Sequence, residues 1–196
     1  MVFDLNCSFS LTANPNGPWQ VGFTRAGSLD PADFVASTHA DPSDVVGLWH
    51  PDDRTYYPYV AWNSSALARV DATNSWAVRP HEVAMEGAAS GQLAVVRFVA
   101  PEAGHYFIQA TFEGIHFRHS TTDVHVWLGA RPLFDGIVDG YGGFAAFHSQ
   151  ADPTGTQIFT GEIAVLGGDI LSFAVGPNGA NFNDTTGLGL RLEARP

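Results

Sequence analysis

The residues that could do chemistry gather first in one stretch, FEGIHFRHSTTDVHVWLGARPLF. It holds three histidines, His116, His119 and His125, together with the acid Asp123 and the indole of Trp127. Three imidazoles can bind zinc, iron or copper if they converge within about 2.0–2.1 Å of one point. One hypothesis for the chain is therefore a metal-dependent enzyme that uses His116, His119 and His125.

The spacing within DVHVWL favours a different interpretation. A period of two predicts a β-strand whose apolar side chains face the core, while Asp123, His125 and Trp127 face the other way. If that second face is covered, the three are packing residues, because large aromatic side chains are mostly buried. If it is open, it is a sugar-binding strip, in which indole stacks on a pyranose and the polar groups bond to hydroxyls.

A second aromatic group lies in the segment HPDDRTYYPYVAWN. Its rings fall on both parities of a strand, which indicates that one face of this strand is not core. Tyr57, Tyr59 and Trp62 are candidates for stacking on sugar rings. Pro58 favours an edge strand, so the alternative is that the rings fasten the neighbouring chain.

The segment GPNGANFNDTTG carries the side-chain oxygens that calcium prefers. Calcium takes 6–8 such oxygens, although this spacing is not that of an EF-hand loop. Clusters of Asn, Asp, Thr and Gly also make ordinary turns. We predict Asn183 as a residue that hydrogen-bonds to sugar hydroxyls, and Asp184 with Asn181 as candidate ligands of a structural calcium ion.

The elements that must position these residues are predicted to be β-strands. The 196 residues include 21 Gly, 12 Pro, 14 Phe and 5 Trp, which is typical of many turns between aromatic-rich strands. After Leu93 short segments of strand period follow one another, with turn residues between them and no convincing helix. This pattern predicts an all-β fold, an antiparallel β-sandwich of jelly-roll type, which fills a single domain at residues 1–196.

The N-terminal part is less regular. FDLNCSFSL alternates apolar and polar residues, which predicts a strand with Cys7 as a buried thiol. Residues 28–55 carry acids, prolines and small residues without a sustained period, and we expect a long loop there with one short helical turn after Pro31. A loop of this length on a compact β domain is often functional.

Charge and motif content exclude several classes of function. The net charge is −11 and all nine basic residues are arginine, so the surface repels phosphate backbones and anionic membranes. We therefore predict no nucleic-acid partner and no membrane partner. The sequence has no Gly-x-Ser-x-Gly elbow, and none of its 20 acidic residues is marked out as half of a glycosidase pair. A noncatalytic protein is favoured.

Several segments resemble a domain common in exported bacterial proteins, including proteins that carry PEP-CTERM sorting signals. They read VVRFVAPEAGHYFIQATFEG, TTDVHVWLGARPLF, VLGGDILSFAVGPNGANFNDTTGLGLRL and, near the start, FDLNCSFSLTANPNGPWQVGF. More distantly, the layout is similar to jelly-roll carbohydrate-binding modules. The resemblance implies secretion to the extracellular space and a noncatalytic role with a polysaccharide or glycan as partner. In such modules an acid that leads into the final strand can ligate calcium, and Asp184 holds that position here.

The sequence thus predicts a secreted, noncatalytic carbohydrate-binding module. Its predicted sugar-binding residues are Trp62, Trp127, Tyr57, Tyr59, Asp123, His125 and Asn183. The alternative is a structural protein that self-associates into an extracellular surface, filament or matrix. The metal-dependent enzyme is the third hypothesis, and structural calcium is the one cofactor that the sequence brings into consideration.

Overall fold

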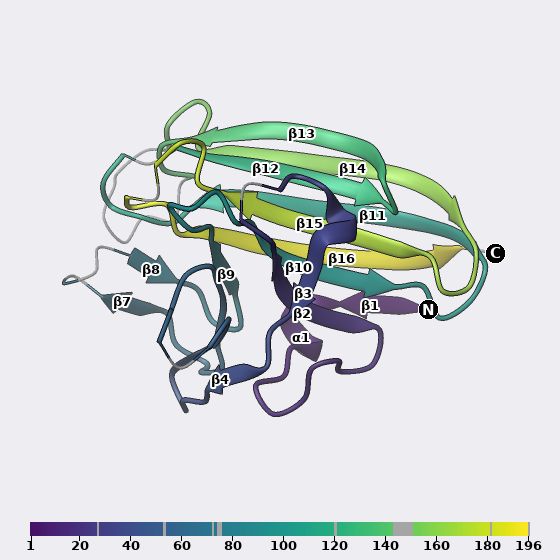
Figure 1. Cartoon of the computed structure of the whole chain (residues 1–196), viewed down its shortest axis with the longest axis horizontal. Coiled ribbons are helices and arrows are strands. Elements are labelled where there is room, and N and C mark those ends of the chain that lie inside the picture. The colour runs from purple at the N-terminus through teal and green to yellow at the C-terminus, as the bar shows by residue number, and fades with distance from the viewer. Residues whose placement is uncertain are drawn as a thin grey trace.

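A computed structural model describes residues 1–26, 28–52, 54–71, 73, 76–119, 121–142, 151–180 and 182–195. Two antiparallel sheets face each other across a hydrophobic core (Figure 1). The first sheet runs in the order β14 (Thr156–Val165), β11 (Gly104–Gly114), β16 (Thr186–Arg195), β9 (Val83–Glu86), β6 (Tyr59–Asn63), β5 (Val46–His50) and β4 (His39–Asp41), and β1 (Val2–Asp4) pairs with β16.

The second sheet runs in the order β13 (Arg131–Asp139), β12 (Thr121–Leu128), β15 (Ile170–Gly176), β10 (Ala94–Val99), β2 (Trp19–Thr24) and β3 (Phe34–Ala36). The hairpin of β7 (Arg69–Asp71) and β8 (Trp76–Val78) forms a small sheet of its own. Two short helices, α1 (Leu5–Ser8) and the 3-10 helix η1 (Pro31–Asp33), complete the described elements. In the described part of the chain, no helix has the length and apolar character needed to cross a membrane.

The strands from β9 to β16 form a jelly roll. In one sheet β9, β16, β11 and β14 are neighbours, and in the other β10, β15, β12 and β13 are neighbours. This order is that of eight strands wound as two Greek keys. The prediction of an all-β, antiparallel sandwich of jelly-roll type is confirmed.

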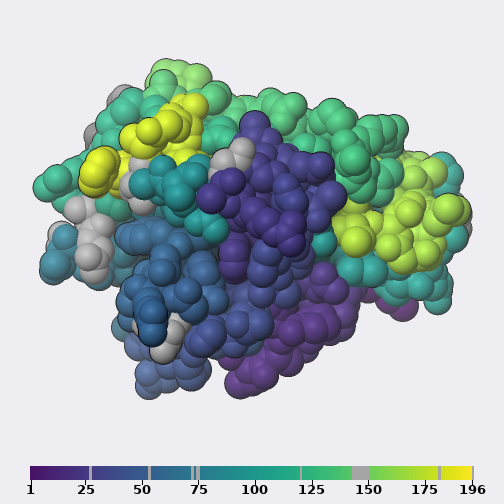
Figure 2. Space-filling view, viewed as in Figure 1, coloured from purple at the N-terminus to yellow at the C-terminus, as the bar shows by residue number. Residues whose placement is uncertain are grey.

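Alternation of side chains along the strands builds the core between the two sheets. On β11 the buried residues are Tyr106, Ile108, Ala110 and Phe112, and the residues between them are more exposed. A second apolar cluster lies on the outer face of the second sheet. Phe34 of β3 packs against this cluster and helps to cover it. The N-terminal segments, purple and blue, occupy the lower part of the face seen in Figure 2 and reach up through its centre.

Two expectations for the N-terminal part are wrong. Residues 28–55 do not form one long loop, because β3, β4 and β5 lie within them, and β3 and β4 have three residues each, too few to show a period. The helical turn expected after Pro31 is present as η1. The first strand ends at Asp4, whose side chain accepts a hydrogen bond from the Cys7 amide at 3.2 Å and caps α1. Cys7 is consequently exposed rather than buried.

Candidate functional site

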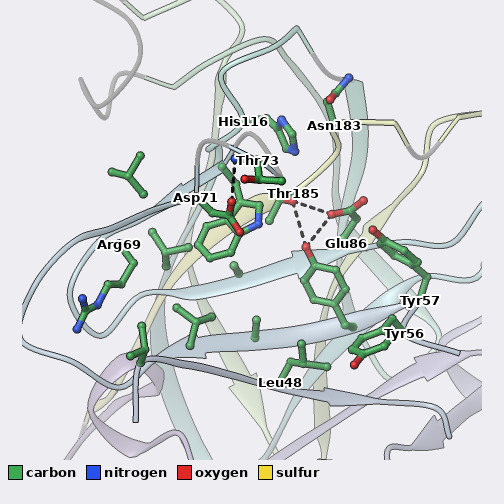
Figure 3. Close-up of a pocket in the computed structure, with 18 of the residues that line it drawn as sticks. Leu48, Tyr56, Tyr57, Arg69, Asp71, Thr73, Glu86, His116, Asn183 and Thr185 are labelled. Atoms are coloured by element: carbon green, nitrogen blue, oxygen red, sulfur yellow. Dashed lines mark hydrogen bonds between the residues drawn. The ribbon is translucent and has the colours of Figure 1, made fainter. Parts of the chain in front are cut away.

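A pocket of about 1120 Å³ lies on the outer face of the first sheet, where β5 and β6 extend the sheet beyond β9. On β6 and β9, the core residues Val60, Val83 and Met85 alternate with side chains that point the other way, and these side chains line the pocket. The β7–β8 hairpin contributes one wall, and the segments at 116–118 and 182–185 contribute another (Figure 3).

The floor of the pocket is aliphatic. Ala61 of β6, Ala84 of β9 and Val78 of β8 belong to one buried cluster, and Val46 and Leu48 of β5 pack against it. Burial of these side chains against the β7–β8 hairpin stabilises the extension by the usual ~25 cal/mol per Å² of apolar surface. The extension is therefore a packed part of the domain, and the pocket is a built feature of it.

A network of hydroxyl groups around one carboxylate supplies the polar part of the pocket. Glu86 Oε2 accepts hydrogen bonds from the Tyr59 hydroxyl at 2.7 Å and from Thr185 Oγ1 at 2.6 Å, and the two hydroxyl oxygens lie 3.1 Å apart (Figure 3). Burial raises the pKa of Glu86 although both hydrogen bonds lower it. Burial and the charge of Glu86 raise the pKa of Tyr59 well above its ordinary value, so this hydroxyl remains a donor.

Aromatic side chains form the rim. Tyr56 is 57% exposed, Tyr57 is 41% exposed and Phe182 is 79% exposed. The rings of Tyr57 and Tyr59 lie 5.5 Å apart at 45°. Among the described residues, these three are all of the large aromatic side chains that are well exposed, and all three line this pocket. Exposed rings at the mouth of a concave site are the groups that bind flat apolar surfaces.

His116 closes the pocket from the side of the loop after β11. It is 6% exposed, and its Nδ1 is buried without a hydrogen-bond partner in the described part of the structure. Burial and the charge of Arg118 lower the pKa of His116 to about 4. The imidazole is therefore neutral at pH 7, with one donor and one acceptor nitrogen.

Three of the predicted sugar-binding residues come together here. Tyr57, Tyr59 and Asn183 all line the pocket, and Asn183 has a positive φ of 64°. Trp62 does not join them, because it has the opposite parity on β6. Its ring packs against that of Phe9 on the other side of the sheet, with the centroids 5.7 Å apart and the planes tilted by 32°, and its Nε1 donates to a backbone carbonyl at 3.2 Å.

The other predicted residues lie far away, on the outer face of the second sheet. Trp127 is only 6% exposed and its ring stacks on that of His125 at 4.9 Å and 13°. His125 lies between two carboxylates, with Nε2 2.8 Å from Asp123 and Nδ1 2.6 Å from Asp135. Asp123 also accepts a hydrogen bond from the Asn178 amide at 2.6 Å. This face is covered, as the packing interpretation expects, and leaves Trp127 too little free surface for a sugar ring.

The three histidines of the opening stretch have different partners. His116 lines the pocket, His125 is held by two aspartates, and His119 Nε2 lies 2.6 Å from Asp139. No three His, Cys, Asp or Glu side chains among the described residues are grouped so as to hold a metal ion. The three-histidine site predicted from their spacing does not form, because β12 carries His125 to the other sheet. Spacing along the chain could not reveal this.

The calcium expectation meets one buried carboxylate rather than a set of ligands. Asp184 is 2% exposed, and its Oδ2 has no hydrogen-bond partner in the described residues. Burial and the charge of Glu86 raise the pKa of Asp184 to about 7. The nearby acids Glu86 and Asp123 have their own hydrogen bonds. The second predicted ligand, Asn181, lies outside the described residues. No three His, Cys, Asp or Glu side chains of the described residues gather around Asp184, and calcium binding there stays a prediction.

Sequence reasoning missed the centre of the site. Glu86 looked like any other acid, although it closes the strand VAME, whose other outward residue is Ala84. A carboxylate at the end of so apolar a strand is costly to bury and is a usable signal. Thr185 and Phe182 had no signal of their own, because their roles depend on where β16 begins beside β9.

Comparisons with known proteins give a distant structural likeness. A scan of protein-family models finds no match, and neither does a search of curated protein sequences. Among solved structures, the chain is similar to a family 51 carbohydrate-binding module of Clostridium perfringens in complex with methyl-galactose. The identity is 13% and the TM-score 0.41, over 81% of this chain and 95% of the module.

Two family 35 carbohydrate-binding modules are also similar. For the one from Clostridium thermocellum the identity is 9% and the TM-score 0.35, over 90% of this chain and 98% of that module. For the one from Cellvibrio japonicus Abf62 the identity is 11% and the TM-score 0.31, over 90% of this chain and 89% of that module. At these scores the function of the pocket has to rest on its own residues.

Proposed function

We propose that this chain is a noncatalytic carbohydrate-binding domain and that the pocket on β5, β6 and β9 is its binding site. The observation that carries the proposal is the placement of Tyr56, Tyr57 and Phe182, the well-exposed large aromatics among the described residues, at this one pocket. Leaving such rings in water is unfavourable unless a ligand covers them. Sugars suit them, because a pyranose presents a C–H face to a ring and hydroxyls around its edge.

The polar groups of the pocket suit the edge of a sugar. Both hydroxyl donors bind Oε2 of Glu86, and no residue of the described chain donates to Oε1. That oxygen can accept a hydrogen bond from a sugar hydroxyl, and the side-chain amide of Asn183 can both donate and accept. Because these groups are fixed before the ligand arrives, binding costs less entropy than it would with mobile side chains.

The size and charge of the site point to a neutral oligosaccharide segment. The volume of about 1120 Å³ is at the upper end of ordinary ligand pockets, which are about 300–1,000 Å³. A net charge of −11 repels anionic polymers but does not affect a neutral glycan. We therefore infer a polysaccharide or glycan partner of which several sugar units enter the pocket.

The absence of catalysis is part of the proposal. Glycoside hydrolysis uses two carboxyl groups that face each other across the scissile bond, one of them ready to give a proton. Glu86 instead accepts two hydrogen bonds on one oxygen, an arrangement that holds it in place as an acceptor. Secretion is also part of the proposal and rests on the resemblance to exported bacterial proteins. Detection of the protein in the culture medium of its source would test it.

A glycan array followed by titration calorimetry on the best ligand tests the binding site. We expect Tyr57→Ala and Glu86→Gln each to weaken binding about tenfold or more, which corresponds to about 1.4 kcal/mol of lost binding energy. The matched control is Leu166→Ala, which shortens a side chain that is 69% exposed and lies outside the pocket. An array without any bound glycan, or a Tyr57→Ala variant that binds like the parent, would overturn the proposal.

A further inference from the structure

His50, at the end of β5, has one ring nitrogen that no contact in the described structure explains. Its side chain is 6% exposed, and Nδ1 lies 2.6 Å from the backbone carbonyl oxygen of Asp52. A carbonyl oxygen only accepts hydrogen bonds, so Nδ1 carries the proton of the ring. In the neutral imidazole Nε2 is then a bare acceptor.

The bare nitrogen faces a second acceptor. His50 Nε2 is buried without a hydrogen-bond partner among the described residues, and it lies 3.6 Å from Oδ2 of Asp41 on β4. A protonated imidazole beside a carboxylate closes to about 2.7–2.9 Å. Two lone pairs that face each other at a longer distance, with one of them buried, are unfavourable unless something positive lies between them.

The separation fits a metal ion. Zinc bonds to imidazole nitrogen at about 2.0–2.1 Å and to carboxylate oxygen at about 2.0–2.2 Å, so a tetrahedral angle places the two ligand atoms about 3.4 Å apart. The bond from Nδ1–H to a carbonyl oxygen is also the arrangement that orients a metal-binding histidine and fixes its tautomer. His50 thus has its Nδ1 held by a carbonyl oxygen and its Nε2 available to bind a metal ion.

A third ligand lies on the adjacent strand. His39 of β4 pairs directly with His50 across the sheet, and their ring centroids are 5.9 Å apart. Its Nδ1 lies 3.2 Å from Thr38 Oγ1, which leaves Nε2 for a metal. No three such ligands converge as the described side chains stand. Since His39 is exposed, a change of rotamer can bring its nitrogen to the ion at little cost.

We propose that His50 Nε2 and Asp41 Oδ2, completed by His39, bind a divalent transition-metal ion of the zinc type. Imidazole ligands favour zinc and its neighbours in the first transition row over calcium and magnesium, which take oxygen ligands. Asp41 is half-exposed, so the ion can enter from solvent, and the net charge of −11 attracts cations. The ring of His50 stacks on Tyr56 at 5.4 Å and 15°, which places the ion beside the rim of the pocket.

The test uses protein without an affinity tag, freed of metal by a chelator and dialysed. Calorimetric titration with zinc chloride should show one bound equivalent, and cobalt chloride should give the visible absorption of a tetrahedral ion. His50→Gln and Asp41→Asn should each lower zinc affinity at least tenfold, since loss even of an outer partner of a metal ligand costs 10–100-fold. His39→Asn should also weaken binding, and unchanged binding would remove His39 from the site.

The matched control is His105→Gln. His105 Nδ1 lies 3.3 Å from Glu162, so this is another imidazole beside a carboxylate, but both side chains are well exposed. Zinc affinity should not change in this variant. Absence of zinc binding, or equal affinity in the parent and the Asp41→Asn variant, would overturn the proposal. Asp41 lies at the surface, so its variant keeps the test valid if His50→Gln fails to fold.

Discussion

Replacement of His125 by glutamine should remove a pH-dependent part of the stability of this domain. Burial alone would lower the pKa of His125, but its hydrogen bonds to Asp123 and Asp135 and their charges outweigh burial, so the pKa lies above the ordinary 6.5. Both ring nitrogens donate only when the imidazole is protonated. The neutral ring must leave one carboxylate facing a bare nitrogen.

The size of the effect follows from the two contacts. A hydrogen bond to a charged partner contributes about 1.5–3 kcal/mol to stability. The contact with Asp123 has this full value, because the side chains of His125 and Asp123 are 11% and 18% exposed. Asp135 is 63% exposed, and solvent screens its contact. Deprotonation removes the positive charge from both contacts and the N–H from one of them, so we expect it to cost about 2 kcal/mol.

The direction with pH follows from the two shifts. The pKa of His125 is raised in the folded state, so its contribution is complete below about 6.5 and is lost as pH rises through the folded value. Burial alone would raise the pKa of Asp123. The hydrogen bonds from His125 and from the backbone N–H of Asn178 outweigh burial, so the pKa lies below the ordinary 3.8. The contribution of Asp123 is present above about 3.8 and is lost as pH falls through its folded value.

Urea unfolding of the parent and of His125→Gln at a series of pH values from about 5 to about 9 measures this effect. The difference between the two free energies of unfolding isolates His125 from the other titrating groups, and it should fall by about 2 kcal/mol across this range. Leu166→Ala, which shortens an exposed side chain without a titrating group, is the control and should give a flat difference. A flat difference for His125→Gln as well would refute the reasoning.

Two further predictions concern buried positions of the jelly roll. Burial and the charge of Glu86 raise the pKa of Asp184 to about 7. Ionisation of Asp184 therefore lowers the free energy of unfolding as pH rises from about 3.8 through about 7. In metal-free buffer at pH 8, Asp184→Asn should raise the free energy of unfolding by roughly 2–4 kcal/mol at about 1.36 kcal/mol per pKa unit, and a decrease would contradict this. Gly114→Ala would place a Cβ 1.9 Å from the backbone oxygen of Gly140 and should cost about 1–3 kcal/mol. Gly189→Ala, whose Cβ would have its nearest neighbour at 3.9 Å, is the control, and equal melting temperatures of the two variants would refute the packing argument.

The jelly roll could be predicted because its strands are long. Strands β11 to β14 have 8 to 11 residues each, enough repeats of the two-residue period to stand out in the sequence. The strands that extend both sheets have only 3 to 6 residues, and their pattern is lost among turn residues. Their pairing depends on contacts with distant parts of the chain. The chain therefore looked like a sandwich with a loop where it has a widened sandwich.

The candidate site was predicted in pieces. The aromatic residues Tyr57 and Tyr59 were recognised by type, and Asn183 by its polar surroundings in a turn-rich segment. That they meet depends on β16 lying beside β9 and β9 beside β6, which brings Tyr59 to Thr185 across 126 positions of sequence. Residue type alone also could not show that Trp127 is buried rather than free to bind a sugar. Trp127 is covered because it belongs to an apolar cluster against which Phe34 of β3 packs.

The position of the pocket follows from how the domain is widened. A jelly roll alone gives β9 one outer face open to water, on which a buried carboxylate such as Glu86 would be unexpected. Once β5, β6 and the β7–β8 hairpin build walls around that face, Glu86 becomes 4% exposed, and Tyr59 and Thr185 offset part of the cost by donating to it. Both donors bind the same oxygen, so the network uses half of the carboxylate's capacity as an acceptor. A network that served stability alone would gain from pairing the second oxygen as well, and the capacity left over is what a sugar hydroxyl would use.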